Sequence, residues 1–197
     1  VQLTPTQTKA LILPSKTNEP PTITALFEQQ QLQNNLWSWN YQTIDSEPKA
    51  GVFSSMGINQ FTNPVIAYFD DEQDALKIAE NTPEGWEVRK IPSNNRTGFF
   101  PSIAVDVDNT YHISHFVYDL NQIWYTTYFK GVWSSALVVS GIVSGGTQIL
   151  LDTNDSPIIL FTNTKNKTIK IARRISGKWQ IESITRGGIN GDEGNHF

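Results

Sequence analysis

The stretch GFFPSIAVDVDNTYHISHFVYDLNQIWYTTYFKGVWSSALV, residues 98–138, decides the fold, because its pattern returns on both sides of it. A tryptophan opens a similar β-favouring run four times, at spacings of 49, 47 and 46 residues: Trp37, Trp86, Trp133 and Trp179. A glycine precedes the last three of them by one or two residues. Self-similarity at a period on the order of 40–50 residues indicates a repeat architecture.

The agreement extends to two further runs in each unit. The first run recurs at residues 64–69, 111–116 and 157–162. The second recurs at residues 76–79, 123–126 and 169–172. In both cases the copies are 47 and then 46 residues apart. With the turn residues between them, each unit predicts four short strands. The sequence therefore predicts an all-β fold, a β-propeller of four-stranded antiparallel blades. A β-helix or a sandwich is the structural alternative, and residues 24–33 are the best helix candidate although they align with a strand.

The repeat divides the chain into units within one β-propeller region, residues 1–197. The units are a blade at 9–50 that lacks its first strand, blades at 51–97, 98–143 and 144–190, and the start of a further blade at 191–197. About four blades are seen, and we expect them to be part of a larger propeller of roughly five to eight blades. The alternatives are a closed four-bladed ring and an open fan that closes against another chain, because exposed sheet edges are unstable alone.

Composition removes several classes of function. The net charge is −4 and the pI is about 5.3, so no basic surface is set up for nucleic acid. The chain has no cysteine, which excludes disulfides and thiolate metal sites. Its apolar stretches are far shorter than the roughly 20 residues of a membrane span. The chain starts at Val1 without a signal-peptide pattern, which suggests a processed or partial chain.

Three motifs carry a family resemblance: Pro101-Ser-Ile-Ala-Val-Asp106, His112-Ile-Ser-His115 and Leu76-Lys-Ile-Ala79. They resemble the degenerate repeats of sialidase-like (BNR-like) propellers and of related bacterial propeller lectins, over residues 9–197. The Ser-x-Asp-x-Gly-x-x-Trp box of sialidases is absent from all four tryptophan regions. None of the five arginines lies in the family's catalytic setting: Arg89, Arg96, Arg173, Arg174 and Arg186. The resemblance implies the fold, and we predict no catalytic residue.

The third unit departs from the rule of its own repeat. Trp124 stands where the sister units have Lys77 and Lys170. The residues that the other units share at this position are enough for packing, so a different residue in this unit indicates a ligand-binding site. Aromatic rings flanked by polar side chains suit carbohydrate binding, although extra packing between blades is the alternative. The predicted ligand-binding residues are His115, Tyr118, Asp119, Trp124 and Tyr125.

Oxygen-bearing side chains gather in the turn formed by Asp106, Asp108 and Asn109. The leading interpretation is that Asp and Asn are good turn formers, so no cofactor is expected. The alternative is a Ca²⁺ site on these three residues, the one cofactor that we consider. Asp70 and its neighbours are expected in a solvated turn rather than in an acid–base pair. His112 and His115 lie three apart on a strand, point to opposite faces and cannot both bind one metal ion.

Three functions remain. The leading hypothesis is a non-enzymatic binding or scaffold propeller, secreted or at the cell surface, that recognises glycan or protein surfaces. The second is a fragment of a sialidase-like glycoside hydrolase whose catalytic residues lie outside this segment. The third is a structural subunit of a larger surface assembly, in which other subunits or remaining blades cover the open edges.

Overall fold

The computed structural model describes residues 40–93, 95–141, 146–164 and 167–184. The chain divides into two units, Val1–Thr43 and Ile44–Phe197. All strands of the described residues lie in the second unit, and no helix occurs among them. The predicted first blade, apart from its end, and the predicted start of a further blade lie outside the described residues, as does the helix candidate. No helix long and apolar enough to cross a membrane is found in the described part of the chain.

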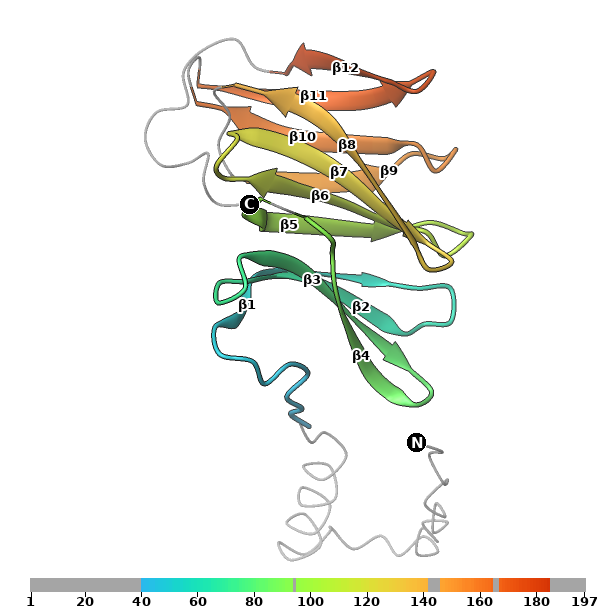
Figure 1. The fold of residues 1–197 in the computed structure, drawn as a ribbon. Helices are drawn as coiled ribbons and strands as arrows, with labels where there is room; N and C mark the ends of the chain where they lie inside the picture. The colour runs from blue at the N-terminus through green and yellow to red at the C-terminus, as the bar shows by residue number, and fades with distance from the viewer. Residues whose placement is uncertain (1–39, 94, 142–145, 165–166, 185–197) are drawn as a thin grey trace, which may run out of the picture. The chain divides into compact units, whose positions relative to one another are not determined.

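Three antiparallel sheets of four strands follow one another along the chain (Figure 1). The first sheet consists of β1 (Ala50–Ile58), β2 (Pro64–Asp70), β3 (Ala75–Thr82) and β4 (Gly85–Lys90). The second consists of β5 (Thr97–Val105), β6 (Tyr111–Val117), β7 (Gln122–Phe129) and β8 (Val132–Ser140). The third consists of β9 (Thr147–Leu151), β10 (Pro157–Asn163), β11 (Thr168–Ile175) and β12 (Lys178–Ser183). The all-β prediction is confirmed.

Each sheet is a meander in which consecutive strands pair, and the repeated turn residues make this geometry. Between the first and second strands, Thr62, Asn109 and Asp155 adopt φ values of 63°, 67° and 56°. The side chain that begins each turn holds it: Oδ1 of Asn59, Asp106 and Asp152 accepts hydrogen bonds from the amides two and four residues further on. The same turn chemistry therefore restarts the second strand at Pro64, Tyr111 and Pro157.

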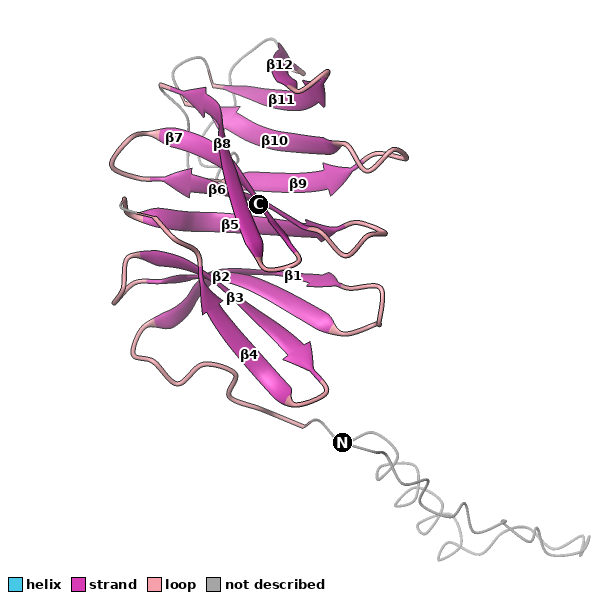
Figure 2. Cartoon of the chain, turned by 45° about the vertical axis from the view of Figure 1, so that its right-hand side comes forward, coloured by secondary structure: helices cyan, strands magenta, loops and turns pink. Residues whose placement is uncertain are grey.

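The sheets stack face to face, with the second between the other two (Figures 1 and 2). One apolar cluster joins the first two sheets, and includes Val65, Ile78, Ile103 and Ile113. A second joins the next two sheets, and includes Ile123, Tyr125, Ile149, Ile159 and Phe161. Trp133 packs against the first cluster and Trp179 against the second, so these repeated tryptophans fill space between neighbouring sheets.

The segment that leads from β4 to β5 is tied to the first sheet. The Ile91 amide donates to the Leu76 carbonyl at 2.8 Å, and the Thr97 amide donates to the Asp74 carbonyl at 3.4 Å. Gly98 follows with a φ of 105°, and a Cβ on it would lie 2.5 Å from the Leu76 Cβ. Glycine is required there both by the left-handed backbone and by the close approach. These bonds hold Ile91 and Thr97, near the two ends of the segment, against the first sheet.

Candidate ligand-binding site

A pocket of about 110 Å³ lies between the β4–β5 segment and strands β6, β7 and β8. Its lining residues are Ile91, Pro92, Ser93, Asn95, Thr97, His115, Val117, Trp124, Thr126 and Ser135. A water molecule takes roughly 30 Å³ of liquid volume, whereas drug-sized ligands occupy pockets of roughly 300–1,000 Å³. The pocket therefore fits one edge of a small ring rather than a whole drug-sized molecule.

A row of hydrogen-bonded side chains crosses one face of the second sheet. His115 Nδ1 lies 3.0 Å from Thr97 Oγ1, and His115 Nε2 lies 2.9 Å from Thr126 Oγ1. Thr126 Oγ1 lies in turn 2.8 Å from Ser135 Oγ. Burial lowers the pKa of His115 to about 3. The imidazole is therefore neutral near pH 7, with one nitrogen that donates and one that accepts.

Trp124 supplies the aromatic surface of the pocket. It lies opposite His115 in the β6–β7 pairing, and its side chain is half-buried. Its indole Nε1 donates to Gln122 Oε1 at 2.8 Å, which fixes the orientation of the ring. Ile91 and Pro92 add apolar surface to the lining. The pocket thus combines an oriented indole with a row of hydroxyl groups.

The structure brings together two of the five predicted ligand residues, His115 and Trp124. Tyr125 is 4% exposed and packs at 5.4 Å against Trp179, because consecutive strand residues face opposite sides. Tyr118 is 59% exposed and lies over Phe99 at 5.5 Å, away from the pocket lining. Asp119 is exposed in the turn after β6.

The hydroxyl groups of the row were not predicted as site residues. Thr126 stands where the sister sheets have Ala79 and Ala172. Ser135 stands where they have Val88 and Ile181. The signal that would have identified them is the replacement of apolar sister residues by hydroxyl side chains in two neighbouring strands, on the face that also carries Trp124.

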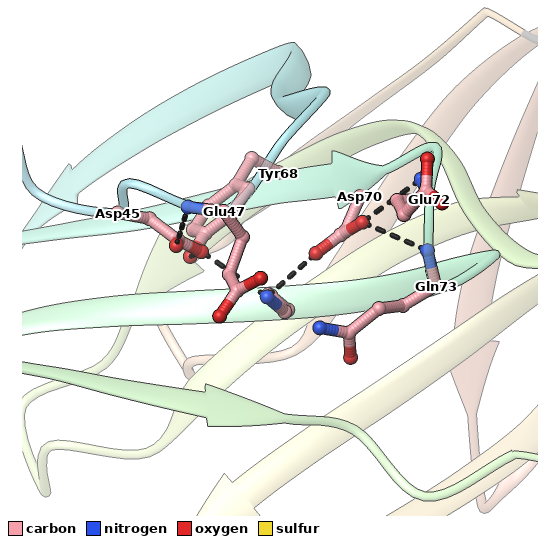
Figure 3. Close-up of polar contacts among 7 residues, drawn as sticks. Asp45, Glu47, Tyr68, Asp70, Glu72 and Gln73 are labelled. Carbon is pink, nitrogen blue, oxygen red and sulfur yellow. Dashed lines mark hydrogen bonds and ion pairs between the residues drawn. The ribbon is translucent and has the colours of Figure 1, made fainter.

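The equivalent place in the first sheet is occupied by an ion cluster around Lys77 (Figure 3). Lys77 Nζ lies 2.6 Å from Asp70 Oδ2 and 3.2 Å from Asp45 Oδ2. The Tyr68 hydroxyl donates to Asp45 Oδ2 at 2.6 Å. Asp70 Oδ1 accepts hydrogen bonds from the amides of Glu72 and Gln73 at 3.0 and 2.9 Å (Figure 3). Asp70 is fully buried, so the expectation of a solvated turn position was wrong for this residue.

The partners of the cluster keep its members ionised. Burial tends to raise the pKa of Asp70, but its hydrogen bonds from Lys77 and from the backbone outweigh burial and lower it. Burial likewise acts to raise the pKa of Asp45, and the hydrogen bonds from Tyr68, the Glu47 amide and Lys77 lower it on balance. The pKa of Lys77 is raised, although burial opposes the rise. The cation that replaces Trp124 here is therefore bound to carboxylates of the chain itself.

The oxygens of the predicted Ca²⁺ turn bind protein donors. Asp106 Oδ1 accepts from the amides of Asp108 and Thr110 at 2.9 and 2.7 Å, and Asp106 Oδ2 lies 3.0 Å from His112 Nε2. Asn109 Oδ1 accepts from the Gln60 amide at 3.2 Å. Within the described ranges, no group of three or more His, Cys, Asp or Glu side chains is arranged to hold a metal ion. The Ca²⁺ site stays a prediction.

The described arginines serve separate places in the fold. Arg89 pairs with Glu80 at 2.8 Å, and Arg96 pairs with Asp74 at 2.6 Å. Arg173 pairs with Glu182 at 3.3 Å, and these last two residues are both partly solvent-exposed. Arg174 lies over the ring of Tyr125 at 5.5 Å. Together with Arg173 it lines a second pocket of about 330 Å³ at one end of the third sheet.

Neither a family model nor a curated protein sequence matches this chain. Among solved structures, the chain is similar to a fucose lectin from Kordia zhangzhouensis, solved in complex with methyl-fucoside. The two are 14% identical, the match covers 68% of this chain and 99% of that chain, and the TM-score is 0.48.

Proposed function

We propose that this chain is a non-enzymatic carbohydrate-binding protein, and that the edge of a sugar ring binds in the pocket beside Trp124. The side chain at this position differs between the three repeated sheets, and that difference carries the proposal. Lys77 and Lys170 stand at the sister positions, and Lys77 is neutralised by the chain's own carboxylates. Only in the second of the three described sheets is the position aromatic, and there it borders a pocket.

The chemistry of the lining supports a sugar as the ligand. The C–H groups of a sugar pack on an indole ring, and sugar hydroxyls need partners that both donate and accept hydrogen bonds. Trp124 offers the ring, and the row from Thr97 to Ser135 offers the hydroxyl groups. Core packing requires neither, since the sister sheets pack with lysine and alanine at two of these positions.

The scaffold of this proposal is a β-propeller in which each described sheet is one of the predicted blades 51–97, 98–143 and 144–190. Strands β1 and β5 each begin one residue before the predicted boundary, at Ala50 and Thr97. Sheets of four antiparallel strands that stack face to face through apolar clusters support it, as does the contact of β5 with both β1 and β9. A glycan-binding protein of this kind acts where glycans are displayed, so we place it outside the cell or at the cell surface.

A glycan array with the whole chain tests the function, and Trp124→Ala tests the site. We expect the wild type to bind a subset of glycans, and Trp124→Ala to bind them about tenfold more weakly or worse, because the stacking surface is lost. The matched control is Tyr118→Ala, which removes an exposed aromatic ring outside the pocket and leaves binding unchanged.

The remaining functions give different results in the same samples. No glycan binding, together with a stable stoichiometric protein complex in native mass spectrometry, contradicts the proposal and favours a structural subunit. Release of free sugar from the array glycans contradicts it in favour of a hydrolase. Equal binding by the wild type and Trp124→Ala moves the site away from this pocket.

A further inference from the structure

We infer that the Trp124 pocket accepts only an uncharged, hydroxyl-bearing edge of a sugar and rejects carboxylated or sulfated sugars. The inference rests on the proposed function and adds the class of ligand to it. The row formed by Thr97, His115, Thr126 and Ser135 sets this choice, and we call it the hydroxyl–imidazole row.

The lining holds no charged side chain: its members are apolar, hydroxyl, amide or imidazole groups. An anion that enters such a place gives up part of its hydration and gains no cation in return, which is unfavourable for a charged group. His115 does not supply the missing charge, because it is buried, with 3% of its surface exposed, and both its ring nitrogens already contact hydroxyl groups. The pocket is therefore unfavourable for a carboxylate or a sulfate.

The hydroxyl–imidazole row is suited to a diol. If His115 donates from Nδ1, Thr97 accepts and keeps its own hydrogen for the pocket, while Thr126 donates to Nε2 and Ser135 donates to Thr126. Ser135 then offers lone pairs. In the other tautomer all the donors reverse, so that Ser135 offers a hydrogen and Thr97 offers lone pairs.

In either tautomer the two ends of the row present one donor and one acceptor to the pocket, since each hydroxyl has one hydrogen and two lone pairs. Thr97 and Ser135 both line the pocket. Neighbouring sugar hydroxyls both donate and accept, so they satisfy both ends. A carboxylate only accepts hydrogen bonds, so at the accepting end of the row its oxygens face the lone pairs of the hydroxyl group.

The first sheet shows what an anion requires at this place in the repeat. There Lys77 replaces Trp124 and Tyr68 replaces His115. These two residues hold the Asp45 carboxylate, with Lys77 Nζ at 3.2 Å and the Tyr68 hydroxyl at 2.6 Å. In the first sheet, a carboxylate is thus bound by a cation at the position that Trp124 occupies in the second.

Matched sugar pairs test the inference. The probes are the methyl glycosides of glucose, galactose and mannose and the corresponding methyl uronides, titrated at pH 7 by calorimetry. Each pair differs in one group, CH₂OH against COO⁻. We expect at least one neutral glycoside to bind. Its uronide is expected to bind about tenfold more weakly or worse, which corresponds to the loss of one hydrogen bond to the pocket.

Two variants assign the effect to residues. Ser135→Ala removes one end of the row and is expected to weaken neutral binding about tenfold. Ser134→Ala is the control, because this neighbour is also exposed but lies on the opposite face of β8, and it is expected to leave binding unchanged. Trp124→Lys recreates the side chain of the first sheet and is expected to reverse the preference toward the uronide.

The outcomes separate the two proposals. A uronide that binds within about twofold of its neutral partner overturns the selectivity while leaving carbohydrate binding intact. Equal effects of Ser135→Ala and Ser134→Ala remove the row from the explanation and overturn its role. Failure of the neutral glycosides and of every array glycan to bind overturns the proposed function, and the inference with it.

Discussion

The Lys77 cluster and the Trp124 pocket occupy the same place in two consecutive sheets, and they use it in opposite ways. In each sheet the place is a cross-strand pair of the second and third strands, Tyr68 with Lys77 and His115 with Trp124. The first sheet fills it with charges that satisfy one another. The second fills it with neutral groups and leaves space. The backbone is kept, and the side chains decide between internal pairing and a site open to a ligand.

The two solutions differ in what they contribute to the molecule. A buried cation with two carboxylates is sensitive to the loss of any member, because the remaining charges are left without a partner. A hydroxyl row loses about 1 kcal/mol per neutral hydrogen bond. Substitutions are therefore expected to reduce stability in the first sheet and ligand affinity in the second.

The largest expected effect is that of Lys77→Met. It leaves Asp70 and Asp45 buried without their cation, which is expected to cost about 3–5 kcal/mol of unfolding free energy. The control is Lys170→Met at the sister position of the third sheet, where the half-buried lysine makes no ion pair with another described residue. That change is expected to cost less than about 1 kcal/mol. Urea unfolding measures both, and equal costs contradict the comparison.

The strands of these sheets could be predicted from the sequence because their signals are local. Turn residues such as Asn109 and Asp155 restart each second strand, and short, largely apolar runs follow. Two of the pocket residues could also be predicted from the sequence. Trp124 differs from the lysines at its sister positions, and His115 pairs with it across the hairpin.

The rest of the site depends on contacts that no local pattern contains. Asp70 ends an apolar run and precedes polar residues, a pattern typical of a solvated turn, yet it is the last residue of β2 and its buried carboxylate pairs with Lys77. Tyr125 was grouped with Trp124 because they are adjacent, although adjacent strand residues face different sheets. The open space itself depends on where residues 91–97 lie, and that is set by their bonds to the first sheet.

Gly98 tests how that segment is held. Gly98→Ala places a Cβ 2.5 Å from the Leu76 Cβ on a left-handed backbone, and is expected to cost about 2–4 kcal/mol. Gly51→Ala at the sister position meets nothing within 4 Å at a φ of 92°, and is expected to cost about 1 kcal/mol from backbone strain alone.

Thermal unfolding of both variants measures this difference. Because Gly98 anchors the wall of the pocket, Gly98→Ala is also expected to weaken glycan binding at a temperature where the variant is still folded. Gly51→Ala is expected to leave binding unchanged. Equal destabilisation by the two substitutions contradicts the role given to the contact with Leu76.

The smallest expected effect is the response of the two places to acid. The pKa values of Asp45 and Asp70 are lower in the folded state than in the unfolded chain, so their contribution is present above about pH 4 and is lost as pH falls through the folded values. Asp45→Asn removes one of these groups. It is expected to reduce the acid-induced loss of stability between pH 7 and pH 3, because one carboxyl whose pKa is lowered by folding no longer contributes.

Trp124→Ala is the counterpart in the second sheet, and is expected to leave the acid response unchanged. The pocket has no carboxylate in its lining, and the pKa of His115, at about 3, keeps the imidazole neutral over most of this range. Urea unfolding at a series of pH values compares both variants with the wild type. If Trp124→Ala changes the dependence of unfolding free energy on pH as much as Asp45→Asn does, the Trp124 pocket contains a titrating charge, which contradicts its neutral character.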